Sequence, residues 1–78
     1  MDIAVAFGKV LREARLSQKV TQEALAAQAG LQRNYVSLME RGHHQPTLAT
    51  IFALAVALNS SPLDLVKSTT MEKISVSE

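Results

Sequence analysis

Cysteine is missing from the whole 78-residue sequence. Without it, the chain has no disulfide, no thiol nucleophile and no cysteine-ligated zinc site. No apolar run approaches the roughly 20 residues that a membrane-spanning helix needs, and the first residues lack the basic and apolar regions of a secretory signal. We therefore expect a soluble, cytoplasmic protein.

Side chains suited to catalysis are also scarce. The two histidines, His43 and His44, are neighbours, and the acidic residues are scattered, with no paired carboxylates and no glycine-rich phosphate loop. Adjacent histidines lack the i, i+4 spacing of a helical metal site, and no third ligand accompanies them. The sequence therefore predicts neither an enzyme nor a metal site, and it indicates no cofactor.

The composition is that of a folded globular domain, with 47% apolar and 19% charged residues. A domain this small buries only about 60% of its unfolded surface, so dimerisation would add useful stability. The net charge of +1 conceals a local basic excess. Charge alone does not distinguish a nucleic-acid surface from an ordinary solvated one. Between residues 9 and 41 lie Lys9, Arg12, Arg15, Lys19, Arg33 and Arg41 against Glu13, Glu23 and Glu40.

The patterns predict an all-α fold of five helices, because no alternation of apolar residues indicates a strand. The first helix covers about four turns from Ile3, with apolar residues at three- and four-residue steps. Thr21 is a good N-cap for a second helix over residues 22–29, and Gly30 supplies the positive φ that ends it. A third helix is expected over residues 32–40.

A fourth helix should follow the cap Thr47, and a fifth should follow Ser61, with Pro62 at its first position and an acid in its first turn. The fourth is expected to be the central core helix because apolar residues repeat along it with helical period: Leu48, Ile51, Phe52, Ala55 and Leu58. Residues 67–78 are rich in Ser and Thr with scattered charges. We expect them to form a polar, flexible C-terminal tail after a domain over residues 1–66.

Three residues match the steric demands of two helices that cross at a steep angle. Ala26 is small where the second and third helices must approach, Gly30 lies at the turn, and Val36 packs back from the third helix. A short turn between two such helices is typical of a helix-turn-helix.

The sequence resembles the Cro/repressor (Xre-like) family of helix-turn-helix regulators from Phe7 to about Val66. It also looks like the restriction–modification controller proteins, which are similarly short. The resemblance implies sequence-specific binding of double-stranded DNA by a transcription regulator that acts as a homodimer on a palindromic operator. The matching segments are Thr21-Gln22-Glu23, Leu25-Ala26, Gly30-Leu31, Tyr35-Val36-Ser37, Glu40-Arg41-Gly42 and Pro46-Thr47-Leu48, with Ile51, Ala55 and Leu58.

In this family the third helix enters the major groove, where every base pair presents a distinct pattern of donors and acceptors. Arg33 can pair bidentately with guanine, and Gln32 or Asn34 with adenine. The alternative is that these are ordinary solvent-facing polar residues. By resemblance, the residues expected to contact bases are Gln32, Arg33, Asn34, Ser37 and Leu38.

A second set of residues matches family positions along the phosphate backbone. Gln22 matches a glutamine that touches phosphate and often braces the third helix, and a helix N-terminus suits an anion. For Tyr35 the alternative is a ring packed between the third and fourth helices. The full set expected to contact phosphate is Gln22, Tyr35, Arg41, His43, His44 and Gln45.

The resemblance also implies structural roles and shows two departures. Arg15 and Glu40 match an ion pair that bridges the first helix to the end of the third. Lys19 stands where the family usually has glycine, so this turn must tolerate strain or adopt another conformation. Gln32 replaces the usual Ser or Thr cap, which weakens the start of the third helix.

Dimerisation is expected to use the fifth helix. The seam predicted for it is Leu63, Leu65 and Val66, with Phe52 or Leu58 nearby, although these residues could instead only close the monomer core. The alternative function is an antitoxin or other partner-binding regulator that uses the same helix-turn-helix. Such an antitoxin generally needs an extra neutralising segment, and residues 67–78 are short and weakly apolar.

Overall fold

The computed structural model describes the backbone of residues 2–76 and the side chains of residues 2–72. These residues form five helices and no strand, which confirms the predicted all-α class. The helices are α1 (Ile3–Ser17), α2 (Gln22–Ala29), α3 (Arg33–Glu40), α4 (Leu48–Ala57) and α5 (Pro62–Val76).

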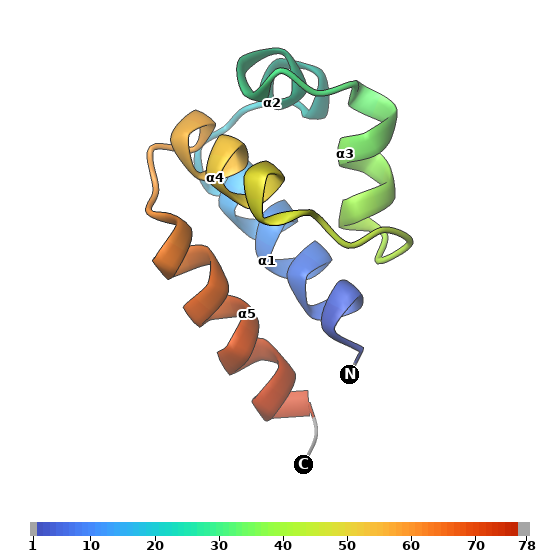
Figure 1. The fold of residues 1–78 in the computed structure, drawn as a ribbon, viewed down its shortest axis with the longest axis vertical. Helices are drawn as coiled ribbons and strands as arrows, with labels where there is room; N and C mark the ends of the chain where they lie inside the picture. The colour runs from blue at the N-terminus through green and yellow to red at the C-terminus, as the bar shows by residue number, and fades with distance from the viewer. Residues whose placement is uncertain (1, 77–78) are drawn as a thin grey trace.

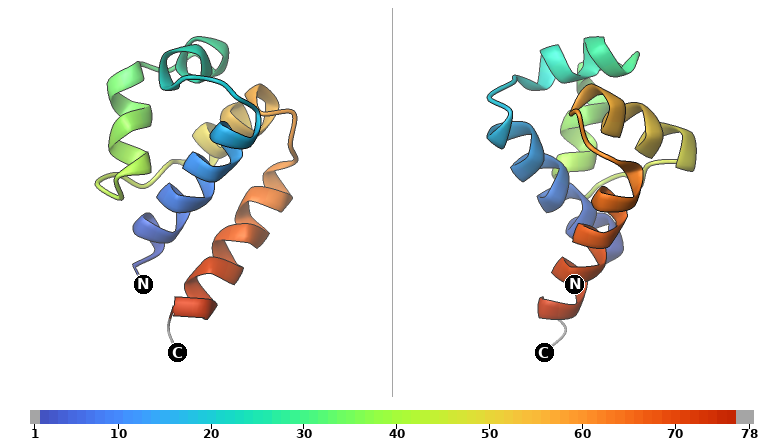
Figure 2. Two further views of the ribbon diagram at one scale, coloured as in Figure 1. Left: turned by 180° about the vertical axis from the view of Figure 1, so that it is seen from behind. Right: turned by 90° about the vertical axis from the view of Figure 1, so that its left-hand side faces the viewer.

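Helix α1 lies at the centre of the fold, with α3 packed on one side and α5 on the other (Figure 1). Helices α1 and α5 run side by side in opposite directions, as both views of Figure 2 show. Helix α2 lies across the far end of the molecule and packs against α3 and α4. This arrangement leaves α3 at an edge of the molecule, with one face against α1 and α2.

Side-chain hydroxyls begin three of the helices at the caps predicted from the sequence. Because they accept hydrogen bonds from backbone N–H groups that have no partner inside the helix, they stabilise each first turn. The N–H of Ala24 donates to Thr21 (3.0 Å), that of Thr50 to Thr47 (3.1 Å) and that of Asp64 to Ser61 (3.2 Å). Helix α3 begins at Gln32 without such a side-chain bond, as the replacement of Ser or Thr predicts.

One apolar core is shared by all five helices. Partly buried residues, Ile51 and Tyr35 among them, pack around it. Its buried members are Phe7, Val10, Leu11, Leu25, Ala26, Val36, Met39, Leu54, Ala55, Leu58 and Leu65.

Helix α4 presents a different face to the core from the one expected. Leu54, Ala55 and Leu58 are buried, but Leu48 and Phe52 are 70% and 53% exposed. The prediction of an inward Leu48 and Phe52 is therefore wrong. Since α4 is apolar on almost every side, helical spacing could not decide which of its faces meets the core.

Helix α5 continues through residue 76, whereas a flexible tail was expected from residue 67. Thr69 is 7% exposed, and its hydroxyl donates to the carbonyl of Leu65 at 2.8 Å. A hydroxyl that bonds back to the preceding turn is compatible with helix, so the Ser/Thr-rich composition does not require a coil. Residues 77–78 of the expected tail lie outside the described residues.

The chain bends by 107° between α4 and α5. Asn59 has a φ of 54°, and the N–H of Ser60 donates to the carbonyl of Ala55 at 2.8 Å, which closes the end of α4. No single helix in the described part of the chain is long and apolar enough to cross a membrane. Only α4 and residues 62–72 of α5 taken together have that length and composition, across this bend.

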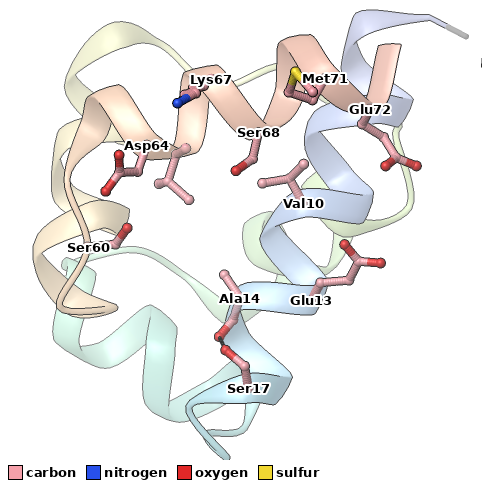
Figure 3. A pocket seen from close by; sticks show the side chains of 11 residues that line it. Val10, Glu13, Ala14, Ser17, Ser60, Asp64, Lys67, Ser68, Met71 and Glu72 are labelled. Carbon is pink, nitrogen blue, oxygen red and sulfur yellow. Dashed lines mark hydrogen bonds between the residues drawn. The ribbon is translucent and has the colours of Figure 1, made fainter. Parts of the chain in front are cut away.

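A groove of about 770 Å³ runs between α1 and α5 (Figure 3). Small side chains such as Ala14, Ser60 and Ser68 line it. Lys9 on α1 forms an ion pair with Glu72 on α5 at 2.8 Å. The hydrogen bond to Glu72 raises the pKa of Lys9 above its ordinary value.

Candidate nucleic-acid interface

The turn between α2 and α3 has the geometry that its glycine predicts. Gly30 has a φ of 71°, a left-handed conformation that glycine adopts without a steric penalty. The N–H of Leu31 donates to the carbonyl of Ala26 at 2.8 Å, which closes the end of α2. Ala26 and Val36 are 2% and 0% exposed, so both lie at the crossing of the two helices, as predicted.

Helix α3 separates a buried face from an exposed one. Val36 and Met39 are fully buried, whereas Gln32, Arg33 and Asn34 at the start of the helix are exposed. Within the described residues, the guanidinium of Arg33 makes no hydrogen bond or ion pair. The first turn of α3 therefore presents a charged and two amide side chains to solvent.

One helical turn further on, the other two residues expected to contact bases are less exposed. Ser37 and Leu38 are half-buried. Both lie on α3 between its exposed start and its C-terminal end, where Arg41 donates from Nε to the carbonyl of Ser37 at 3.4 Å. All five residues predicted to read bases thus belong to one helix and its cap.

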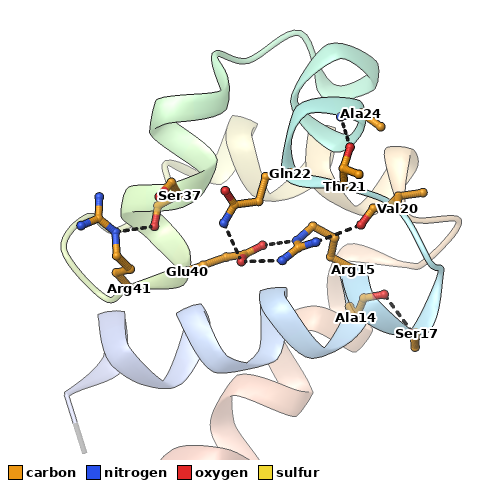
Figure 4. A network of polar contacts seen from close by, with 10 residues as sticks. All are labelled: Ala14, Arg15, Ser17, Val20, Thr21, Gln22, Ala24, Ser37, Glu40 and Arg41. Atoms are coloured by element: carbon orange, nitrogen blue, oxygen red, sulfur yellow. Dashed lines mark hydrogen bonds and ion pairs between the residues drawn. The ribbon is translucent and has the colours of Figure 1, made fainter.

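A carboxylate joins three helices behind this surface (Figure 4). Glu40 at the end of α3 accepts from Arg15 Nε at 2.6 Å and Arg15 Nη2 at 3.1 Å, and from Gln22 Nε2 at 3.0 Å. Arg15 Nη1 donates to the carbonyl of Val20 at 2.9 Å. The ion pair predicted between Arg15 and Glu40 is present, and Gln22 braces α3 as the resemblance implied.

The network is buried and satisfied. The side chains of Arg15 and Glu40 are only 10% and 3% exposed. The hydrogen bond to Glu40 raises the pKa of Arg15 above its ordinary value. Because folding raises this pKa, the charged guanidinium stabilises the fold at every pH below the ordinary pKa of arginine. The contribution is lost only above that pKa, so Arg15 is charged at neutral pH. The start of α2 is thereby fixed to the end of α3.

The loop between α3 and α4 holds most of the remaining phosphate candidates. Arg41, His43, His44 and Gln45 are all exposed. Gly42 turns the chain with a φ of 78°. Among the described residues, no group of three or more metal-ligating side chains includes the histidine pair. These candidates form an exposed, polar and partly basic edge next to α3.

Tyr35 is half-buried, and its ring packs against the core. The ring also meets His44 edge-on, with 6.0 Å between the ring centroids. This position agrees with the packed ring that the sequence left open as the alternative for Tyr35. Whether the hydroxyl also meets a phosphate stays a prediction.

The residues predicted for the dimer seam divide into buried and exposed ones. Leu65 is 3% exposed and belongs to the monomer core, as does Leu58 at 2%. The prediction for Leu65 is therefore wrong, because its side chain is already used within one chain. Leu63 and Val66 are 74% and 44% exposed, and Phe52 is also exposed.

A row of apolar side chains lies on the outer face of α4. Leu48, Phe52 and Val56 are spaced four residues apart, so they share one face of the helix. They are 70%, 53% and 75% exposed. We call these three residues the α4 stripe. The sequence showed its residues but not their exposure.

Two helices joined through a left-handed glycine, the second of them with a polar exposed start, define a helix-turn-helix domain. The sequence profile of the helix-turn-helix family matches residues 11–65. The chain therefore belongs to the helix-turn-helix family, as its resemblance to Cro/repressor-like regulators and controller proteins predicted.

The proteins to which this chain is similar include restriction–modification control proteins. The control protein C.BamHI of Bacillus amyloliquefaciens is 38% identical over 71 residues, covering 90% of this chain and 88% of that protein. The crystal structure of the controller C.AhdI of Aeromonas hydrophila is 44% identical with a TM-score of 0.78, covering 80% of this chain and 90% of that one. The controller C.Esp1396I, solved as a tetramer with its natural 35 base-pair operator, is 25% identical with a TM-score of 0.82, covering 92% and 95%.

Proposed function

We propose that this protein is a sequence-specific DNA-binding transcription regulator that reads the major groove with α3. The observation that carries the proposal is the exposed start of α3, where Arg33 has no internal partner among the described residues. The buried network at Glu40 fixes the end of α3 against α1 and α2, so the helix backbone is already positioned before DNA binds. The C.Esp1396I controller, which was solved in complex with its operator, supports DNA binding by this chain.

Each candidate takes a role that suits its chemistry. Arg33 pairs with guanine, and the amides of Gln32 and Asn34 pair with adenine. Ser37 and Leu38 contact bases one turn further along α3. Around them, the residues that bind the phosphate backbone are Gln22, Tyr35, Arg41, His43, His44 and Gln45, and these contacts fix the register without reading sequence.

The protein acts as a homodimer on an inverted repeat. One recognition helix reads only a few base pairs, and dimers place two such helices about 34 Å apart, one turn of DNA. The exposed apolar residues favour a seam made by the α4 stripe with Leu63 and Val66. A regulator of this kind has no catalytic step, and it works in the cytoplasm, where the DNA is.

Selection of bound fragments from random duplex DNA tests the proposal directly. We expect one recurring sequence with two-fold symmetry and half-sites one helical turn apart. Recovery of unrelated sequences would contradict sequence-specific binding.

Arg33→Ala then tests the assigned face of α3. If Arg33 reads guanine, its loss should remove about 1–3 kcal/mol of discrimination at one position of each half-site. Titrations against the selected operator, its single-base variants and random duplex measure this. The matched control is Lys67→Ala, which removes an exposed cation from α5 and should leave base preference unchanged. Unchanged affinity and preference in Arg33→Ala would remove Arg33 from the interface.

A further inference from the structure

One face of α1 lies against the end of α3. A Cβ at Gly8 would lie 2.4 Å from the carbonyl oxygen of Met39, so the two backbones touch there. Val5 lies against Gly42 in the same way, and Arg15 binds Glu40. Because residues 5, 8 and 15 are separated by helical steps, they define a single face of α1 that borders the recognition helix.

Arg12 lies on this same face, four residues after Gly8 and three before Arg15. It is exposed, and in the part of the chain that the structure describes its guanidinium makes no hydrogen bond or ion pair. Glu40, the carboxylate on this side, already accepts from Arg15 and Gln22.

The charged residues of α1 lie on two different sides of the helix, one toward α5 and the other toward α3. Glu13 lines the groove toward α5, as Figure 3 shows, and Lys9 is paired with Glu72 across it. Arg12 lies instead on the side of α3 and of the network that holds the start of α2. Gln22, the first residue of α2, donates from Nε2 to Glu40 at 3.0 Å, so the start of α2 lies near the end of α3 that α1 contacts. A helix N-terminus suits an anion.

We propose that Arg12 binds a phosphate of the DNA backbone, so that the contact surface extends from the helix-turn-helix onto α1. The inference rests on the proposed function and adds a residue that neither the resemblance nor the periodicity selected. The competing role is structural: a guanidinium near the last carbonyls of α3 would stabilise that helix through its dipole. The two roles differ in how DNA affinity depends on salt.

The salt dependence of binding to a labelled duplex of random sequence measures the phosphate contact. Each phosphate contact contributes about 0.9 to the slope of log affinity against log salt concentration. A dimer carries two copies of Arg12, so between about 50 and about 200 mM salt the wild type should lose about 12-fold more affinity than Arg12→Gln. Arg12→Lys retains the charge and should keep the wild-type slope.

Lys67→Ala, which removes an exposed cation from α5, is the matched control and should also keep the wild-type slope. Melting temperatures of all variants are measured alongside. A wild-type slope in Arg12→Gln, with or without a lower melting temperature, would overturn the phosphate contact and leave the proposed function standing. A wild-type protein that shows no salt-dependent binding would instead overturn the proposed function itself.

Discussion

Among residues 2–76, two residues other than glycine have a left-handed backbone, and both follow the end of a helix. Lys19 has a φ of 60° and Asn59 a φ of 54°. Asparagine tolerates this region, but for most L-residues it costs about 1–2 kcal/mol. The turn at Lys19 is kept by neighbouring bonds, among them the one from Arg15 Nη1 to the carbonyl of Val20 at 2.9 Å. The glycine that the family usually has at this position can adopt the left-handed backbone without strain.

Lys19→Gly should stabilise the protein. Relief of the left-handed strain should exceed the roughly 0.5–1 kcal/mol by which glycine's greater freedom favours the unfolded chain. We expect a gain of about 0.5–1 kcal/mol, which corresponds to a rise of roughly 2–8 °C in melting temperature for a domain of this size. Differential scanning calorimetry measures it.

Asn59→Gly is the matched control at the other left-handed position. It should gain less, because asparagine is already tolerated there. A lower melting temperature in Lys19→Gly than in the wild type would show that the turn is not strained in solution.

At the scale of elements, the contact between α1 and α3 includes a buried ion pair between Arg15 and Glu40. Removal of one partner from such a pair costs about 3–5 kcal/mol, because it leaves an uncompensated charge. Arg15→Ala and Glu40→Ala should each destabilise the fold by about this amount. The double variant should be milder than the sum of the two by about 0.5–3 kcal/mol. Chemical denaturation of the four proteins gives this coupling.

The Lys9–Glu72 pair provides the comparison. Its side chains are 50% and 23% exposed, and solvent screens such pairs. The same cycle on this pair should show no resolvable coupling. Additive effects at Arg15 and Glu40 would mean that the pair does not bridge α1 to α3 in solution.

Local chemistry made the boundaries of most helices predictable. Thr21, Thr47 and Ser61 cap helices as their sequence positions indicate, and Gly30 ends α2. These signals act within a few residues, so they can be interpreted without the tertiary structure. The extent of α5 was not predictable in this way, because Thr69 and its neighbours depend on packing against α1.

The candidate site was only partly predictable for the same reason. The exposed start of α3 follows from helical spacing, and the Arg15–Glu40 pair from the resemblance. Which face of α4 is buried does not follow, since Leu48 and Leu54 are equally apolar. The position of Tyr35 against His44, with 6.0 Å between their ring centroids, depends on the path of a loop that sequence does not specify.

At the scale of the whole molecule, the α4 stripe is the apolar surface that a second copy would cover. Phe52→Glu should shift the protein from dimer to monomer at micromolar concentration, because a charge would be buried in the seam. Sedimentation velocity measures this, and the melting temperature of the variant reports whether it is folded. Met71→Glu is the matched control, since Met71 is similarly exposed at 61% but lies in the groove between α1 and α5.

Met71→Glu should remain a dimer. A dimer in both variants would move the seam away from the α4 stripe. A wild-type protein that is a strict monomer both free and on DNA would reject dimerisation altogether.

A dimer joined through the α4 stripe, as proposed above, would make the regulator sensitive to its own abundance. Two chains that associate through a small apolar surface dissociate on dilution, and their apparent stability then rises with total concentration by mass action. Below the dissociation constant of the dimer, the amount of dimer grows with the square of the monomer concentration. Occupancy of a two-fold site that binds the dimer then also rises with the square of the monomer concentration. A newly made regulator would therefore occupy its operator only after a delay. It would then saturate the operator over a narrow range of expression.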